Sequence, residues 1–544
     1  MNLFYKTALF ALLVLTSLGS KVIVRESPRV ASPGVASPGV ASPLRTSFPV
    51  TLDLKEEFQT IHSFGASDCW SAKFIGTWQN EAKKNQIADL LFSLDTLPGG
   101  QPKGIGLSLW RMNIGAGSYE QKDSSLITDE WRREACFLTP DGRYDWSKQA
   151  GSQWFLQAAR RRGVRYALGF TNSPPVQMTR NGKAFSAGGK SFNLKPAALA
   201  PFADFLTTVA TYFQLDYLSP INEPQWDWTA GKNGKANQEG SPAENKDIAD
   251  VKSALSAKLA ASKAKTTVVA GEAGQLNYLY EKAESGRGDQ LDYFFSKSER
   301  PSLTRLPNVE PIWAYHSYFT TCTDSTLVAM RQKAAQRAKA VGNPMLWQSE
   351  FGVLGDICGK YNGSPRHTDI QYGLYVAKVI HNDLTVANVT SWQWWLAINP
   401  YDYSDGLVYI SGPDGQYKKH DNARQDGQVL DSRQLWALGN YARFVRPGMK
   451  RIGVRLGTAS NPVAEASQCM VSAYKDPIRK QLVLVCINMT SNPVTLPLNG
   501  IRVKNNRFVS YTTTDTKSLA KSTVSANQIQ LEPTSVMTVV GQYQ

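Results

Sequence analysis

The sequence lacks several patterns that would each point to a particular class of protein. Its six cysteines and five histidines form no CxxC pair and none of the Cys/His spacings of a zinc site, so we expect no bound metal. Beyond the first 20 residues, no segment is long and apolar enough to predict a membrane-spanning helix. The formal net charge is +15, yet no block of clustered lysine and arginine is interleaved with aromatic residues, which disfavours a nucleic-acid-binding protein.

The N-terminus has the layout of a secretory signal peptide. Lys6 precedes an apolar run at 8–15, which is followed by small residues up to Ser20. We assign residues 1–20 to this signal and expect a secreted protein, periplasmic or extracellular. Residues 21–46 contain VASPGVASPGVASP, a repeat that can bury little surface, and they predict a flexible tether or a leftover propeptide.

Export permits disulfide bonds among the six cysteines. Cys322 and Cys358 are the pair that we favour. The alternative is that all six cysteines are reduced and mostly buried.

Short apolar runs alternate with helix-like segments along most of the chain. The predicted strands are 61–66, 105–114, 164–170, 215–222, 266–271, 311–316, 344–350 and 388–396. The predicted helices are 80–93, 147–162, 196–213, 243–260, 290–297, 325–341, 368–382 and 432–444. Eight such strand–helix units predict a parallel (β/α)8 barrel, the TIM-barrel architecture, over residues 60–446.

After residue 446 the pattern changes to alternating strands with turn residues between them. The stretch CMVSAYKDPIRKQLVLVCINM, for example, predicts a hairpin that turns at Pro477. Residues 447–544 therefore predict a small antiparallel β-sandwich, and FPVTLDL, within residues 47–59, is expected to add an N-terminal strand to it. The expected fold class is α/β, a TIM barrel with a C-terminal β-sandwich side domain.

Two glutamates are predicted to lie at the mouth of the barrel, where the loops that follow the strands gather. Glu223 follows the fourth predicted strand and Glu350 ends the seventh, so their carboxyl groups are expected to face each other. Retaining glycosidases place two carboxyl groups about 5 to 5.5 Å apart, one to donate a proton and one to attack the anomeric carbon. The pair predicts this chemistry, with Glu223 as the acid/base and Glu350 as the nucleophile.

Other polar residues at the predicted strand ends support this pairing. Arg111 and Tyr318 provide a cation and a hydroxyl donor that can hold Glu350 ionised. Asn222 offers an amide to a sugar hydroxyl, and His316 is expected to orient its neighbours because the two glutamates already fill both proton-transfer roles. A glutamate at a strand end is, taken alone, more often solvated or salt-bridged, and it is the combination that favours catalysis.

The motifs GFTNSPP, SPINEPQWDW, AYHSY, LWQSEFG, SWQWWLA and SFGASDCW resemble glycoside hydrolase family 30, and within it the branch typified by endo-β-1,6-galactanases. The resemblance covers nearly the whole mature chain. It implies a (β/α)8 barrel joined to a β-sandwich, and a retaining double displacement with Glu223 as acid/base and Glu350 as nucleophile. Related enzymes act on β-1,6-galactan, β-1,6-glucan, xylan, β-fucosides and glucosylceramide, so the resemblance leaves the substrate open.

Several further residues are candidates for sugar binding. Asp68 is expected to accept hydroxyl hydrogens, as an acid does at this place in similar enzymes; the alternative is a loop-forming or helix-capping role. Asn172 follows the third predicted strand, and Trp70 and Trp394 offer flat apolar faces to pyranose rings. Because side chains alternate along a strand, Trp394 and Trp395 are expected to face opposite ways, and we predict that Trp394 faces the sugar.

The loop at 399–424 carries the basic residues Lys418, Lys419 and Arg424. A basic rim would suit a uronate, as in glucuronoxylan-cleaving relatives, whereas the alternative is a solvated turn. We therefore predict an endo-β-1,6-galactanase, with a xylanase, a glucuronoxylanase or a β-1,6-glucanase of the same family as alternatives.

A non-catalytic carbohydrate-binding protein is a further alternative, which the presence of both glutamates together with the arginine and the tyrosine disfavours. We expect no cofactor, a polysaccharide or oligosaccharide as the bound partner, and a monomer.

Overall fold

The computed structural model describes residues 46–188, 191–283, 286–296, 305–417, 419–457 and 461–544. The predicted signal peptide and the predicted tether up to residue 45 lie outside the described residues. Within these ranges, no helix has the length and apolar content needed to cross a membrane.

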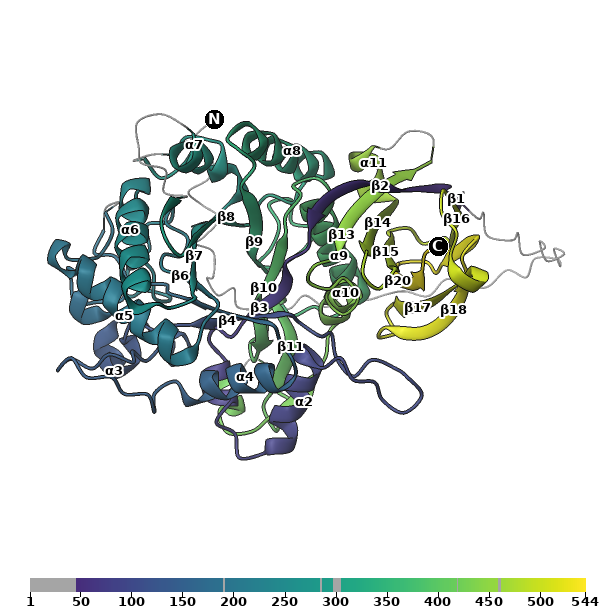
Figure 1. The fold of residues 1–544 in the computed structure, drawn as a ribbon. Coiled ribbons are helices and arrows are strands. Elements are labelled where there is room, and N and C mark those ends of the chain that lie inside the picture. Colours follow the sequence, from purple (N-terminus) through teal and green to yellow (C-terminus); the bar gives the residue numbers. More distant parts are fainter. Residues whose placement is uncertain (1–45, 189–190, 284–285, 297–304, 418, 458–460) are drawn as a thin grey trace, which may run out of the picture. The chain divides into compact units, whose positions relative to one another are not determined.

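Eight parallel strands close into a barrel (Figure 1). They are β3 (Ser63–Ser67), β4 (Leu109–Asn113), β5 (Tyr166–Phe170), β6 (Tyr217–Ser219), β7 (Thr267–Ala273), β8 (Val309–His316), β9 (Met345–Phe351) and β10 (Ser391–Asn399). Each strand pairs with the next in chain order, and β10 pairs with both β9 and β3, which closes the sheet. The predicted (β/α)8 barrel is confirmed.

Each barrel strand is followed along the chain by a helix of six or more residues (Figure 1). These helices are α2 (Glu81–Phe92), α4 (Ala150–Arg161), α5 (Leu199–Phe213), α6 (Asn245–Ser262), α7 (Gln290–Phe295), α8 (Asp324–Ala340), α9 (Ile370–Thr385) and α10 (Arg433–Ala442). Some begin at a side chain that accepts an otherwise unpaired backbone N–H. Asp369 caps α9 at 2.9 Å and Ser432 caps α10 at 3.1 Å. The short helices α1 (Ala72–Ile75), α3 (Ser118–Gln121) and α11 (Pro462–Ser467) lie in connecting segments.

The last barrel strand continues past the closed part of the barrel. β11 (Gly406–Ser411) runs parallel to the second half of β10, and β12 (Gln428–Leu430) pairs antiparallel with β11. The long loop after β10 is therefore partly structured by these two strands and is anchored beside the barrel mouth.

The side domain is a ten-stranded sheet formed by both ends of the described chain. Its strands are β1 (Thr46–Ser47), β2 (Val50–Thr60), β13 (Lys450–Leu456), β14 (Cys469–Asp476), β15 (Gln481–Asn488), β16 (Val494–Asn499), β17 (Arg507–Thr513), β18 (Ala520–Ser525), β19 (Gln528–Leu531) and β20 (Ser535–Gln542). The pairs β1–β16 and β16–β2 are parallel and the others are antiparallel. β2, which begins at the third residue of FPVTLDL, pairs with β13, and β14 and β15 form the predicted hairpin.

This sheet buries apolar side chains on both faces. Alternate residues of β15 separate into two clusters, because successive side chains of a strand point to opposite faces. Val483, Val485 and Ile487 belong to the same core as the barrel, whereas Leu482, Leu484 and Cys486 pack inside the curled sheet. The barrel and the side domain therefore share one continuous core along α9 and α10.

The favoured disulfide is present in the structure. Cys322, in the loop after β8, is bonded to Cys358, in the loop after β9. The other four cysteines are free and buried, and the bond ties together two loops at the mouth of the barrel.

Candidate active site

Glu350 lies at the end of β9 in a buried pocket of hydrogen-bond donors. Arg111, at the centre of β4, donates to its Oε2 at 2.6 Å, and the Tyr318 hydroxyl donates to its Oε1 at 3.0 Å. Burial raises the pKa of Glu350, and the positive charges of His316 and Arg111 act against that rise. Both oxygens of this carboxylate are thus held in place by donors that favour its ionised form.

Glu223 lies just after β6, where the backbone turns sharply. Its φ is 45°, in the left-handed region that few residues other than glycine adopt, and its carbonyl oxygen accepts the indole N–H of Trp228 at 3.0 Å. Such backbone strain persists where the surrounding structure enforces it, and it clusters at functional sites. The Glu223 side chain is 10% exposed, so the carboxyl group is mostly buried by protein but keeps some access to solvent.

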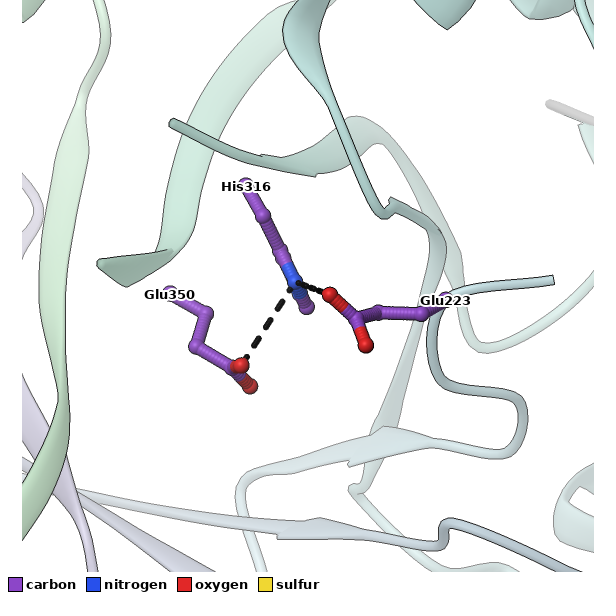
Figure 2. A group of neighbouring side chains, drawn as sticks. All are labelled: Glu223, His316 and Glu350. Carbon is purple, nitrogen blue, oxygen red and sulfur yellow. Dashed lines mark hydrogen bonds and ion pairs between the residues drawn. The ribbon is translucent and has the colours of Figure 1, made fainter. Parts of the chain in front are cut away.

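His316, the last residue of β8, lies between the two glutamates (Figure 2). Its Nδ1 is 2.9 Å from Oε1 of Glu223 and 3.6 Å from Oε1 of Glu350. One oxygen of each glutamate and this nitrogen all lie within 4.8 Å of one another. The two carboxyl groups predicted to form a pair are therefore brought together.

This group of three atoms is poorly suited to bind a metal ion. Burial alone would lower the pKa of His316, but the charge of Glu350 and the hydrogen bonds to Glu223 and Glu272 raise it to about 10. A protonated imidazole carries hydrogen on both nitrogens and has no lone pair left for a metal ion. The arrangement suits proton transfer and charge stabilisation better than metal binding.

Glu272, which was not predicted from the sequence, is a third carboxylate in this site. It is fully buried near the end of β7, and its Oε2 accepts from His316 Nε2 at 2.9 Å, from the Ser349 hydroxyl at 2.6 Å and from Arg111 Nη2 at 3.4 Å. Burial would raise its pKa, yet Arg111 and His316 lower it to about 2. The motif VAGEAG contained the signal, but the predicted fifth strand ended at residue 271, one residue too early.

Polar side chains from the first strands line the neighbouring part of the mouth. Burial raises the pKa of Asp68 to about 8, although it accepts the backbone N–H of Asn113 at 2.8 Å. The Asn172 amide donates to the Asn113 side chain at 3.4 Å. Among the described residues, Asn113 Nδ2, Asn172 Oδ1 and the Trp70 indole N–H are buried without a hydrogen-bond partner. These groups can bind hydroxyl groups of a ligand, since buried polar atoms rarely stay unpaired.

Asn222 forms a hydrogen bond within the protein through its side-chain oxygen, while the contact of its amide nitrogen with a sugar hydroxyl stays a prediction. Its Oδ1 accepts from Arg111 Nη2 at 3.0 Å, and the side chain is buried. The guanidinium plane of Arg111 also lies 3.7 Å from the ring centre of Phe170. Asn222 therefore helps to orient the arginine that contacts Glu350.

Trp394 does not lie at the open surface. It has no exposed area, packs against Phe351 and Trp392, and donates its indole N–H to the Asp405 carbonyl at 2.7 Å. Trp395 is 7% exposed and meets the edge of Trp70 at 5.2 Å between ring centres. β10 shifts register on both sides of Trp394, so strict alternation does not predict which ring faces the mouth.

One basic residue of the loop after β10, Arg424, is paired with acidic neighbours. Arg424 binds Glu130 at 2.9 Å and Asp421 at 3.1 Å, and its guanidinium lies over the ring of Phe74. Lys419 is exposed, and Lys418 lies outside the described residues. The arginine is therefore already paired with carboxylates of the protein.

Comparison with known proteins gives the family of this chain. A family model described as O-glycosyl hydrolase family 30 matches residues 47–409. A conserved exported protein from Bacteroides fragilis is 33% identical, with a TM-score of 0.84 over 90% of this chain and 100% of that one. The catalytic domain of the family 30 xylanase C from Talaromyces cellulolyticus is 20% identical (TM-score 0.63, covering 91% and 100%), and an endo-β1,6-glucanase is 15% identical (TM-score 0.60, covering 91% and 94%). With two thirds of its length matched by the family model, the chain belongs to glycoside hydrolase family 30, whose members are retaining O-glycosyl hydrolases.

Proposed function

We propose that Glu223 is the acid/base and Glu350 the nucleophile of this glycoside hydrolase. The observation that carries the assignment is the separation of the two carboxylates, whose nearest paired oxygens lie within 4.8 Å across the barrel mouth. Retaining enzymes hold the two groups about 5 to 5.5 Å apart, while inverting enzymes need about 6.5 to 9.5 Å to admit a water molecule.

The roles follow from the hydrogen bonds of each carboxylate. Both oxygens of Glu350 accept from protein donors, which favours the ionised form that a nucleophile needs. Oε1 of Glu223 faces His316, which leaves Oε2 as the atom that carries the transferable proton.

The reaction then proceeds in two displacements. Glu223 donates its proton to the glycosidic oxygen while Glu350 attacks the anomeric carbon, so that the bond to the leaving sugar breaks and a glycosyl–enzyme ester forms. Glu223 next removes a proton from water, the water oxygen attacks the anomeric carbon, and Glu350 leaves as a carboxylate.

We propose a neutral polysaccharide as the substrate, with endo-β-1,6-galactanase as the preferred activity. The unpartnered donor and acceptor atoms of Asn113, Asn172 and Trp70 together suit hydroxyl groups, which both donate and accept, whereas a carboxylate only accepts. The ion pairs of Arg424 argue against recognition of a uronate by that residue. A β-1,6-glucanase or a xylanase of the same family is the alternative.

We also propose that the protein is exported, acts as a monomer and loses residues 1–20 as a signal peptide. In this proposal residues 21–46 form a tether, the barrel occupies 60–446, and the side domain combines 47–59 with 447–544. The similarity to an exported protein from Bacteroides fragilis supports export.

The test is product release from β-1,6-galactan, arabinogalactan, β-1,6-glucan, xylan and glucuronoxylan. Wild type is compared with Glu223→Gln, Glu350→Gln and the control Glu239→Gln. Glu239 is a buried glutamate that accepts from Ser118 and from the backbone of Ala116, and not from Arg111, His316 or Tyr318, the donors that hold the catalytic pair. We expect cleavage of one neutral polymer, inactivity of both catalytic variants and activity of the control. A folded wild type that binds a glycan but cleaves none would instead support a carbohydrate-binding protein.

A further inference from the structure

Glu272 connects the two catalytic carboxylates without contacting the mouth of the barrel. It has no exposed surface, and its Oε2 accepts from three donors. Two of those donors are the groups that hold the catalytic pair: Arg111 donates to Glu350 and His316 to Glu223. One carboxylate oxygen of Glu272 is thus linked through hydrogen bonds to the groups that hold both Glu223 and Glu350.

The backbone of Glu272 also fixes Glu223. Its carbonyl oxygen accepts the N–H of Glu223 at 2.9 Å. Both residues have a left-handed φ, 41° at Glu272 and 45° at Glu223, and β7 shifts register across Ala270 and Ala273. Irregularities of this kind re-aim a side chain, and here they turn Glu272 into the centre of the barrel.

We propose that Glu272 is a positioning residue for the catalytic reaction. It keeps both nitrogens of His316 protonated and holds Arg111 in place, so that Glu223 carries one transferable proton. The proposal rests on the roles that we propose for Glu223 and Glu350.

Charge balance gives the physical reason. The buried groups include two cations, Arg111 and His316, and three carboxyl groups, Glu223, Glu272 and Glu350. With all three carboxyl groups ionised the set is negative, and one added proton makes it neutral, the state that a buried site favours. Because the other two carboxylates each bind Arg111, the added proton belongs on Glu223, the acid of the first step.

Replacing Glu272 with glutamine keeps the shape but removes the negative charge. Loss of a negative charge lowers the proton affinity of the whole set, so the catalytic proton leaves at lower pH. Four other ionisable groups surround the set and are unchanged in this variant. Tyr318 and Cys69 interact with Glu350, Asp68 and Cys69 interact with Arg111, and Asp405 interacts with Tyr318.

The experiment measures kcat and KM against pH for wild type, Glu272→Gln and the buried control Glu239→Gln. For Glu272→Gln we expect kcat to fall about 100-fold or more, KM to change less than about threefold, and the basic limb of the profile to move about 1 pH unit or more toward acid. The control keeps the wild-type limb. A Glu272→Gln enzyme with the wild-type profile and kcat within about threefold overturns the proposal.

A second measurement is made on the wild-type protein and does not depend on the folding of Glu272→Gln. With 15N-labelled histidine, the protein gives NMR signals from five histidines. The signal that is missing from His316→Gln belongs to His316. We expect the His316 ring to carry protons on both nitrogens at pH 8. A neutral ring at that pH overturns the proposal. If wild type cleaves no glycan, the proposed function fails while this signal still reports on the protonation of His316, the group that Glu272 contacts.

Discussion

We expect the buried positive charge of Lys252 to lower the stability of the folded protein. Its ammonium lies on α6, almost fully buried between α7 and β8, the strand that carries His316. Its nearest aromatic neighbours are Trp313, 5.2 Å from the ring centre, and Phe294, at 6.0 Å. No described residue forms a hydrogen bond with its Nζ. We expect Lys252→Met, which keeps the length of the stem and removes the charge, to stabilise the protein.

The magnitude follows from the pKa of the buried ammonium. Burial lowers the pKa of Lys252 from 10.5 to about 8. Since each unit corresponds to 1.36 kcal/mol, the charge costs the folded state about 3 kcal/mol at pH 7. A lowered lysine pKa means that the unfolded chain binds more protons between pH 8 and 10.5, so stability rises with pH in that window. The cost falls to about 1 kcal/mol at pH 10.

The assay is urea unfolding of wild type and Lys252→Met at pH 7 and at pH 10. We expect the variant to be more stable by about 3 kcal/mol at pH 7, with most of that advantage lost at pH 10. An advantage that is the same at both pH values would show that packing, and not charge, separates the two proteins. A less stable variant at pH 7 would refute the reasoning altogether.

Three further predictions concern the site and the loops around it. Arg111→Met leaves Glu350 buried without its cation, and we expect kcat/KM to fall about 10²- to 10³-fold. The acid limb of the pH profile should move to higher pH, because the pKa of Glu350 increases further, and near wild-type activity would contradict this. Reduction of the Cys322–Cys358 bond, or replacement of both cysteines by serine, should lower the free energy of unfolding by about 3 to 4 kcal/mol, because the bond closes a loop of 36 residues. An unchanged unfolding midpoint would contradict this prediction. Arg424→Ala should change the activity ratio between neutral glycans and glucuronoxylan by less than about twofold, while a selective tenfold loss on glucuronoxylan would favour uronate recognition.

The fold could be predicted from the sequence because its signals are local. Buried parallel strands appear as short apolar runs, and each one is separated from the next by a helical segment. Glu223 and Glu350 stood at the ends of predicted strands, and a barrel brings all such ends to one mouth. The pairing of these two carboxylates therefore needed only the order of the elements.

Residues that depend on local irregularities of a strand could not be placed in this way. Glu272 enters the site because β7 shifts register just before it, and alternation along β10 fails at Trp394 for the same reason. A shift of one residue moves a side chain to the other face of a sheet. The motif VAGEAG is a signal for the irregularity in β7, whereas the shift in β10 has no clear signal in the sequence.

The amino-acid sequence by itself determined the barrel, the side domain, the family motifs and the two carboxylates that face each other. Only the tertiary structure decided which charges share one buried site, since Arg111, Glu272 and His316 come from three strands far apart in the chain. It also decided that Arg424 is already paired with acidic neighbours. The physical reason is that periodicity reports on the neighbours of a residue along the chain, whereas pKa values and ion pairs depend on distances in space and on exclusion of water.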